Sequence, residues 1–183
     1  MNLPNKITLF RVILIPFFLI SLLVSAIPGG RWIALVIFIV ASLSDMVDGK
    51  LARKYNLVTD FGKFMDPLAD KLLVCSAMIA MIELGKIPAW IVIVIIAREF
   101  TISGFRLIAS DNGKVIAANM WGKVKTTVQM VMIIFLLVAY AAGWNYAATN
   151  IIATVLIYAS LVLTVVSLIT YIASNKDVIS TYK

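Results

Sequence analysis

The chain contains no histidine and only one cysteine, Cys75. Without histidine it lacks the side chain that most often serves as a general base and that commonly ligates metals. A single cysteine can form no disulfide within the chain, and thiol catalysis would lack an imidazole partner. Structural zinc is also disfavoured, because thiolate and imidazole are its usual ligands. Any metal site must therefore rely mainly on oxygen ligands, which suit magnesium, manganese or calcium.

Charged residues are scarce as well. They make up 14% of the 183 residues, whereas 62% are hydrophobic, and a soluble domain would carry about 25% charged residues. This composition predicts an all-α integral membrane protein. Six hydrophobic segments approach the roughly 20 residues that cross a bilayer, and breaks rich in Gly and Pro separate several of them. We predict six transmembrane helices in one membrane domain, residues 1–183, with spans at 8–28, 32–53, 63–84, 88–108, 122–142 and 148–172.

The basic residues are distributed unevenly along these spans. The net charge is +7, which in a soluble protein would suggest nucleic-acid binding. Of the sixteen Lys and Arg residues, however, only Arg31 and Lys86 fall on one side of the predicted bundle, and the other fourteen fall on the side that holds both termini. Because cytoplasmic loops collect Lys and Arg, we expect a multi-pass protein of the cell membrane with both termini in the cytoplasm. We expect no nucleic-acid partner.

The acidic residues are few and concentrated in one place. Five of the nine occur in the run DMVDGKLARKYNLVTDFGKFMDPLAD, at Asp45, Asp48, Asp60, Asp66 and Asp70. Ionisable groups in a membrane segment are costly and usually functional. Spacings of three (Asp45 and Asp48) and four (Asp66 and Asp70) place each pair on one face of a helix. Two neighbouring antiparallel helices would direct both pairs to one point near the cytoplasmic interface, where four carboxylates could hold two divalent cations.

The residues between the two pairs fit a phosphate-containing ligand. Gly49 and Ala52 leave one helix face bare, so that a ligand can approach closely. Arg53 offers a bidentate phosphate donor. We expect a non-helical reversal from Tyr55 to Gly62, in which Gly62 lets the chain turn.

Simpler interpretations exist for single aspartates. Asp66, which precedes Pro67, has the pattern of a helix N-cap. Asp60 could be a cap or loop residue, and Asp45 could form a structural ion pair. These interpretations need a separate reason for each residue, whereas one metal site accounts for four of them.

The same run matches the signature D-x2-D-G-x2-A-R-x8-G-x3-D-x3-D, and in this the chain resembles the CDP-alcohol phosphatidyltransferase family. All the fixed positions are present, at Asp45, Asp48, Gly49, Ala52, Arg53, Gly62, Asp66 and Asp70. The resemblance implies six transmembrane helices, a homodimer, and two divalent cations, Mg²⁺ or Mn²⁺, as cofactors. It implies that Asp45, Asp48 and Asp66 are metal ligands, and that Asp70 is both a ligand and the general base.

The resemblance also implies a site for CDP-diacylglycerol, the donor that loses CMP in the reaction. The residues implied for this site are Asp48, Gly49, Ala52, Arg53, Thr59, Gly62 and Asp66.

The acceptor alcohol differs among members of the family. Three segments resemble the bacterial members that make phosphatidylglycerophosphate from sn-glycerol 3-phosphate, namely LPNKITLFR at 3–11, ARE at 97–99 and GKVKT at 122–126. Glycerol 3-phosphate is a small dianion, so its site needs several cationic groups. The candidates for binding it are Thr8, Arg11, Arg98, Arg106, Lys123 and Lys125.

Several alternatives stay open. The basic residues at the ends of spans four and five could simply follow the positive-inside rule. Arg98 lies inside an apolar segment and needs a partner; Glu99 is the nearest acid in sequence, but adjacent helix positions point in different directions.

The acceptor could instead be serine, inositol phosphate or phosphatidylglycerol. The transfer could proceed by a single displacement or by a double displacement. A small cation- or proton-coupled transporter would carry its carboxylates near the bilayer midplane on several helices, whereas here they cluster at one interface.

Overall fold

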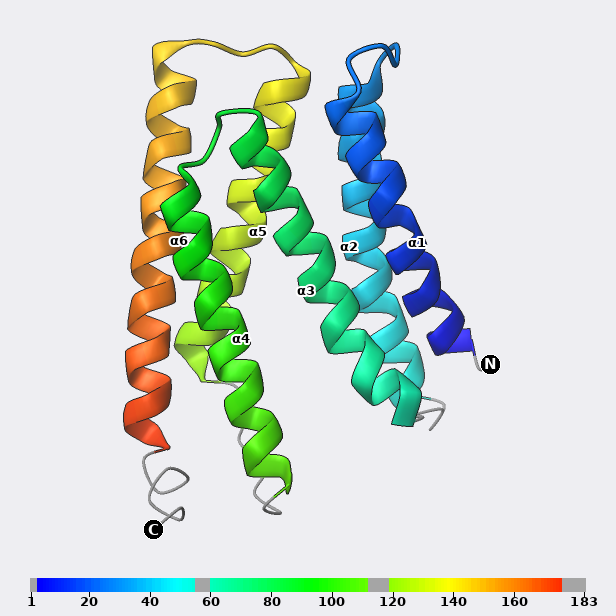
Figure 1. The fold of residues 1–183 in the computed structure, drawn as a ribbon, viewed down its shortest axis with the longest axis vertical. Helices are drawn as coiled ribbons and strands as arrows, with labels where there is room; N and C mark the ends of the chain where they lie inside the picture. Colours follow the sequence, from blue (N-terminus) through cyan, green and yellow to red (C-terminus); the bar gives the residue numbers. More distant parts are fainter. Residues whose placement is uncertain (1–2, 55–59, 112–118, 176–183) are drawn as a thin grey trace. The chain divides into compact units, whose positions relative to one another are not determined.

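A computed structural model describes the backbone of residues 3–54, 60–111 and 119–175. It describes their side chains as well, except those of residues 3–5, 45–54, 60–64, 66–67 and 110–111. Within these ranges the chain is helical and contains no strand, which confirms the all-α prediction. The helices are α1 (Leu3–Leu23), α2 (Gly30–Lys54), α3 (Asp60–Glu83), α4 (Ala89–Asp111), α5 (Met120–Ala141) and α6 (Ala147–Ser174) (Figure 1).

The chain forms two compact units. The first contains residues 1–86 and 133–145, and so includes α1, α2, α3 and the last part of α5. The second contains residues 87–132 and 146–183, and so includes α4, the first part of α5 and α6.

In the first unit, α1 packs against both α2 and α3. The rings of Phe18 on α1 and Phe38 on α2 are fully buried, and their centroids lie 5.8 Å apart. Leu73 and Met81 on α3 are buried as well. Side chains from all three helices therefore contribute to one apolar core, which fixes the two helices that carry the aspartate run.

In the second unit, α4 packs against α6. Ile95 of α4 and Met132 of α5 are fully buried. The buried face of α6 is partly polar, since Thr164 and Ser167 lie on it. Their hydroxyls donate to carbonyl oxygens of the preceding helical turn, at 2.7 and 2.9 Å. Hydroxyl groups satisfied in this way can be buried at little cost.

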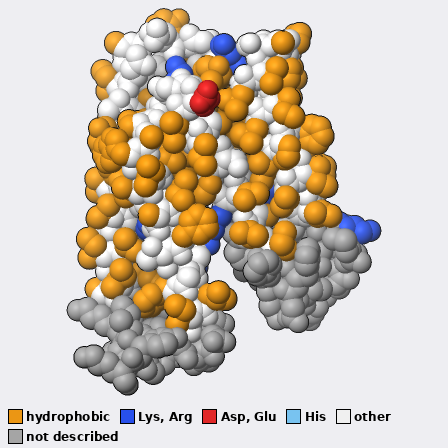
Figure 2. Space-filling view, viewed as in Figure 1, with side chains coloured by type: hydrophobic (Ala, Val, Ile, Leu, Met, Phe, Trp, Pro, Cys, Tyr) orange, Lys and Arg blue, Asp and Glu red, His pale blue; other side chains and the backbone are white. Residues whose placement is uncertain are grey.

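Among the described residues, three helices are long and apolar enough to cross a membrane: residues Lys6–Leu23 of α1, all of α5 and all of α6. Gly30–Ser44 of α2 forms a shorter apolar helix. Large hydrophobic side chains such as Ile13, Ile93 and Val162 are exposed, and Figure 2 shows hydrophobic side chains over much of the described surface on one face. Such a surface suits contact with lipid chains, and the protein is a multi-pass membrane protein.

The first helix begins and ends earlier than the predicted span 8–28. After Leu23 the chain turns, with the Ile27 amide donating to the Val24 carbonyl oxygen at 3.3 Å. Gly29 then adopts φ of +68°, a left-handed conformation that glycine adopts without strain. Hydropathy could not mark this end, because residues 24–27 are almost as apolar as the helix before them. Turns also follow α3 and α5, at Gly85 and Gly143, and both residues have positive φ.

The connection between α2 and α3 also differs from the prediction. The expected reversal extended to Gly62, but α3 already begins at Asp60, so Gly62 is helical. The interpretation of Asp66 as a helix N-cap is wrong for the same reason, because Asp66 and Pro67 lie inside α3. Pro67 is the eighth residue of α3, beyond the first turn, so it removes one intrahelical hydrogen bond.

Candidate active site

The aspartate run covers the last part of α2 and the first part of α3, which are consecutive helices. Asp45 and Asp48 lie on α2, and Asp66 and Asp70 lie on α3. Because both segments are α-helical, the spacings of three and four place each pair on one helix face. The two helices belong to the same unit, contact each other and are joined at this end by residues 55–59 (Figure 1). Both pairs are therefore carried to the same end of the first unit.

Asp70 is the aspartate of this run whose side chain the structure describes. It is half-buried, between the fully buried Ala69 and the core residue Leu73 one turn later. The predicted residues Asp45, Asp48, Gly49, Ala52, Arg53, Gly62 and Asp66 lie on α2 and α3, but their side chains lie outside the described residues, and so does the whole of Thr59. The metal and nucleotide contacts of these residues stay predictions.

Two of the predicted acceptor residues meet in the second unit. Arg98 on α4 is 8% exposed and Lys125 on α5 is 1% exposed. Both donate to the same atom, Oε1 of Glu99: Arg98 Nη1 at 2.8 Å, and Lys125 Nζ through a short contact. Arg98 Nε also donates to the Ser167 hydroxyl on α6, at 3.1 Å. One carboxylate thus holds two buried cations, and the cluster of these residues keeps a formal charge of +1.

The start of α5 is fixed beside this cluster. Asn119 caps the helix, since its side-chain oxygen accepts the amide N–H of Trp121 at 2.5 Å. Its Nδ2 donates to the Thr170 hydroxyl of α6 at 2.9 Å. A Cβ at Gly122 would come within 3.5 Å of Arg98 Nη2, so the Arg98 guanidinium lies directly against the first turn of α5. These contacts determine where Lys125, one turn further on, enters the interior.

The other predicted acceptor residues are placed differently. Arg106 is exposed, and its guanidinium carbon lies 5.7 Å from the centroid of the Tyr171 ring. Lys123 is exposed, whereas Lys125 is buried, so the two lysines occupy different faces of α5. Thr8 and Arg11 are fully buried in the first unit, where Arg11 Nε donates to the Ala41 carbonyl oxygen at 3.3 Å. The structure therefore brings together Arg98 and Lys125, and it does not bring Lys123 to them.

Sequence reasoning missed the roles of Glu99 and Ser167. The expectation that adjacent positions on a helix point apart was wrong for Arg98 and Glu99, because both side chains are long enough to bend toward each other. A signal was present: Glu99 is the single acid in the apolar segment 88–108. An acid in such a segment needs a cation, and Lys125 on the next helix supplies a second one.

Known proteins share much of this sequence. The family model described as CDP-alcohol phosphatidyltransferase matches residues 1–169. A CDP-diacylglycerol–glycerol-3-phosphate 3-phosphatidyltransferase of Bacillus subtilis (strain 168) is 50% identical over 147 residues, which cover 74% of this chain and 76% of the relative. The protein of the same name from Haemophilus influenzae is 40% identical over 180 residues, covering 96% and 94%.

A probable phosphatidylglycerophosphate synthase of Mycobacterium tuberculosis (strain H37Rv) is 38% identical over 177 residues, covering 94% of this chain and 80% of the relative. The matched region includes the whole aspartate run and the cluster around Glu99. The chain belongs to the CDP-alcohol phosphatidyltransferase family.

Proposed function

We propose that the protein transfers the phosphatidyl group of CDP-diacylglycerol to sn-glycerol 3-phosphate, giving phosphatidylglycerophosphate and CMP. The observation that carries this proposal is the complete aspartate signature on α2 and α3, in a chain that shares up to 50% identity with relatives named for this reaction. The relatives named for glycerol 3-phosphate also cover the segment that holds Arg98, Glu99 and Lys125.

The donor set suits two divalent cations, Mg²⁺ or Mn²⁺. Two aspartate pairs, each on one face of its helix, stand at the same end of one unit, and all their donors are oxygen atoms. We assign Asp45, Asp48, Asp66 and Asp70 as the ligands. When bound, the cations would neutralise the pyrophosphate and make the attacking hydroxyl more acidic.

The chain's own residues then have distinct tasks. Asp70 accepts the proton from the 1-hydroxyl of glycerol 3-phosphate. The oxygen forms a bond to the β-phosphorus of CDP-diacylglycerol, the bond from that phosphorus to the bridging oxygen breaks, and CMP leaves with the electron pair. Arg53 donates to the phosphate oxygens on which charge develops. Gly49, Ala52 and Gly62 leave room for the nucleotide, and Thr59 helps to hold it.

We assign Arg98 and Lys125 to recognition of the acceptor's phosphate. Their shared partner Glu99 supports this assignment, because the carboxylate offsets one positive charge in the ligand-free protein and leaves the other for a dianion. Arg106 lies on the same helix as Arg98, two turns further on. Thr8, Arg11 and Lys123 remain candidates from their sequence positions.

The membrane arrangement belongs to the same proposal. We propose that all six helices cross the membrane, that both termini and the aspartate run face the cytoplasm, and that residues 1–183 act as one catalytic domain. The family match, which covers residues in both units, supports a single domain. We further propose a homodimer, as the family resemblance implies; native mass spectrometry should then give about twice the chain mass of 20.1 kDa.

The test is an acceptor panel with purified protein. The protein in detergent, supplied with Mg²⁺ and CDP-diacylglycerol, is incubated separately with glycerol 3-phosphate, serine, inositol phosphate and phosphatidylglycerol, and CMP release is measured. We expect release with glycerol 3-phosphate alone. Release with another acceptor would keep the family chemistry and refute the assigned acceptor, whereas release that persists after exhaustive chelation would refute the metal assignment.

A further inference from the structure

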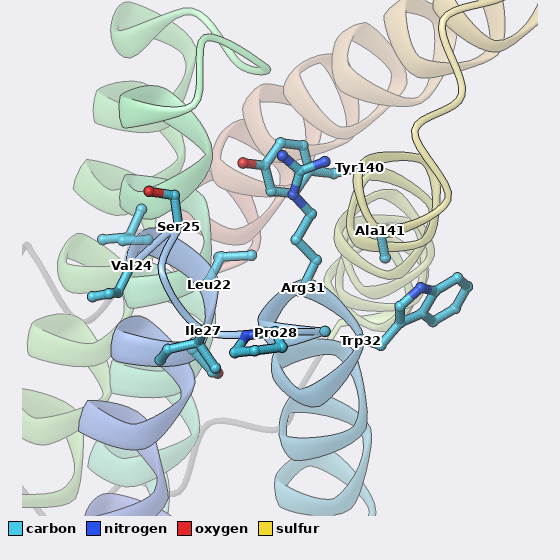
Figure 3. Close-up of a pocket in the computed structure, with 13 residues that line it drawn as sticks. Leu22, Val24, Ser25, Ile27, Pro28, Arg31, Trp32, Tyr140 and Ala141 are labelled. Carbon is cyan, nitrogen blue, oxygen red and sulfur yellow. The ribbon is translucent and has the colours of Figure 1, made fainter.

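A pocket lies in the first unit at the turn between α1 and α2 (Figure 3). This turn is at the opposite end of α2 from the aspartate run. It has a volume of about 350 Å³, within the range of about 300–1,000 Å³ that small-molecule sites have. The turn between α1 and α2 forms most of its lining, and Tyr140 and Ala141 at the end of α5 complete it. Its lining contains no Asp or Glu.

Two cations converge on one aromatic ring at this pocket. The Arg31 side chain extends from the first turn of α2 to Tyr140, and its guanidinium carbon lies 4.3 Å from the ring centroid (Figure 3). Lys86 Nζ, from the turn after α3, lies 5.7 Å from the same centroid. Contact with the ring holds each cation in place, because the face of an aromatic ring carries negative partial charge.

These two cations lack a counter-ion within the described part of the chain. Neither Arg31 nor Lys86 forms an ion pair with a described carboxylate, and both are exposed. Glu83, the nearest acid in sequence to Lys86, lies three residues before it on the exposed end of α3 without pairing with it. The N-terminal end of α2, with the positive end of its helix dipole, adds to the same potential. Positive groups gathered in this way favour an anionic ligand.

Several exposed side chains that line the pocket are hydrophobic. Leu23, Val24 and Trp32 line the pocket and are exposed. Tryptophan is enriched where a membrane meets water, and the pocket lies at the end of an apolar helix, Lys6–Leu23, long enough to span the bilayer. The cations suit an anionic group, and the exposed apolar side chains beside them suit acyl chains. A ligand that has both is an anionic lipid.

We propose that this pocket binds the phosphate of an anionic phospholipid from the leaflet opposite the aspartate run. Arg31, which lines the pocket, and Lys86, which lies over the same Tyr140 ring, bind the phosphate. The Ser25 hydroxyl, also in the pocket lining, is a further donor (Figure 3). The acyl chains lie along the exposed apolar side chains of α1 and α2. This site is separate from the aspartate run and does not depend on the transfer reaction.

The test compares lipid binding in matched variants. Purified protein in neutral detergent is titrated with phosphatidylglycerol or phosphatidylcholine, and bound lipid is counted by native mass spectrometry. Wild type, Arg31→Gln, Lys86→Gln and the double variant are compared with Lys6→Gln, which removes an exposed cation at the other end of α1. We expect tighter binding of phosphatidylglycerol, weakened about fivefold for each pocket cation removed, as for a Lys or Arg beside an anionic lipid surface. Lys6→Gln should leave that binding unchanged.

Several outcomes would overturn the proposal. Equal binding of the two lipids, or equal losses in Lys6→Gln and the pocket variants, would mean that the cations act only through general interfacial attraction. Competition by inorganic phosphate alone would identify a soluble anion as the ligand. CMP release with glycerol 3-phosphate is measured in each variant as a check of folding, and Lys86→Gln alone decides the comparison if Arg31→Gln is inactive.

Discussion

Glu99 is the shared partner of two buried cations. Its Oε1 receives both Arg98 and Lys125, and the Lys125 side chain is only 2% exposed. A buried lysine without a carboxylate partner is strongly disfavoured. Glu99 is therefore a positioning residue: it sets where two cations stand before the acceptor arrives, and it touches no reacting atom in the proposed mechanism.

Glu99→Gln should weaken both stability and acceptor binding. The amide keeps the shape but loses the charge that offsets Arg98 and Lys125, and breaking a buried ion pair costs about 3–5 kcal/mol. We expect a lower Tm and a KM for glycerol 3-phosphate raised about tenfold, or about 1.4 kcal/mol, with the KM for CDP-diacylglycerol little changed. Glu99→Asp should recover part of the loss. Glu83→Gln, at an exposed acid, is the control; equal effects on both KM values would argue for a purely structural role.

Asp70→Asn should abolish most of the transfer while leaving the fold intact. Asparagine has nearly the same size at a half-buried position, and loss of a general base lowers rates by about 10²–10⁴-fold. The measurement is kcat for CMP release, with circular dichroism as the check of helix content. Asp60→Asn, the fifth aspartate of the run and the first residue of α3, should remain near wild type. Activity of Asp70→Asn close to wild type would remove the general-base role.

At the scale of helices, hydropathy predicts the type of element well and its ends less well. Each of the six hydrophobic segments corresponds to a helix in the described part of the chain, because burial in lipid or in a core requires the same apolar composition. That all six cross the membrane stays a proposal. The predicted end of α1 is too late, because Val24 and Ile27 in the following turn are apolar too. The predicted start of α3 is too late, because Gly62 favours a turn although glycine is also tolerated in a helix. Contacts between helices, such as Lys125 with Glu99, have no local sequence signal.

Gly30 gives a direct test of how closely α1 and α2 approach. A Cβ at this position would overlap the Ser21 carbonyl oxygen and would lie 3.2 Å from Ile27 Cβ. Since the backbone would have to shift, we expect Gly30→Ala to cost about 1–3 kcal/mol. Gly104→Ala is the matched control, because nothing lies within 4 Å of a Cβ there; in a helix interior it should be neutral or stabilise by up to about 1 kcal/mol. Thermal unfolding in detergent measures both, and equal Tm values would contradict the close packing.

At the scale of the whole molecule, the distribution of charge separates two chemical environments. In the predicted order of spans, the aspartate run and most basic residues fall on one side of the membrane, and Arg31 and Lys86 fall on the other. Lys and Arg bias orients membrane proteins because translocating positive charge is unfavourable. The proposed orientation therefore follows from the Lys and Arg residues that lie near the aspartate run and near the pocket at the turn between α1 and α2. This orientation can be tested without any assay of activity.

Cysteine labelling should reveal that orientation. In a Cys75→Ala background, which removes the single native thiol, Ser25→Cys lies in the exposed turn after α1 and Lys6→Cys lies at the exposed start of α1. A membrane-impermeant maleimide applied to intact cells should label Ser25→Cys at once and Lys6→Cys only after permeabilisation, because the positive-inside bias places the start of α1 in the cytoplasm. The reverse pattern would put the aspartate run outside the cell. Labelling of both cysteines in intact cells would mean that α1 does not cross the membrane, although its apolar length of 18 residues suffices for it.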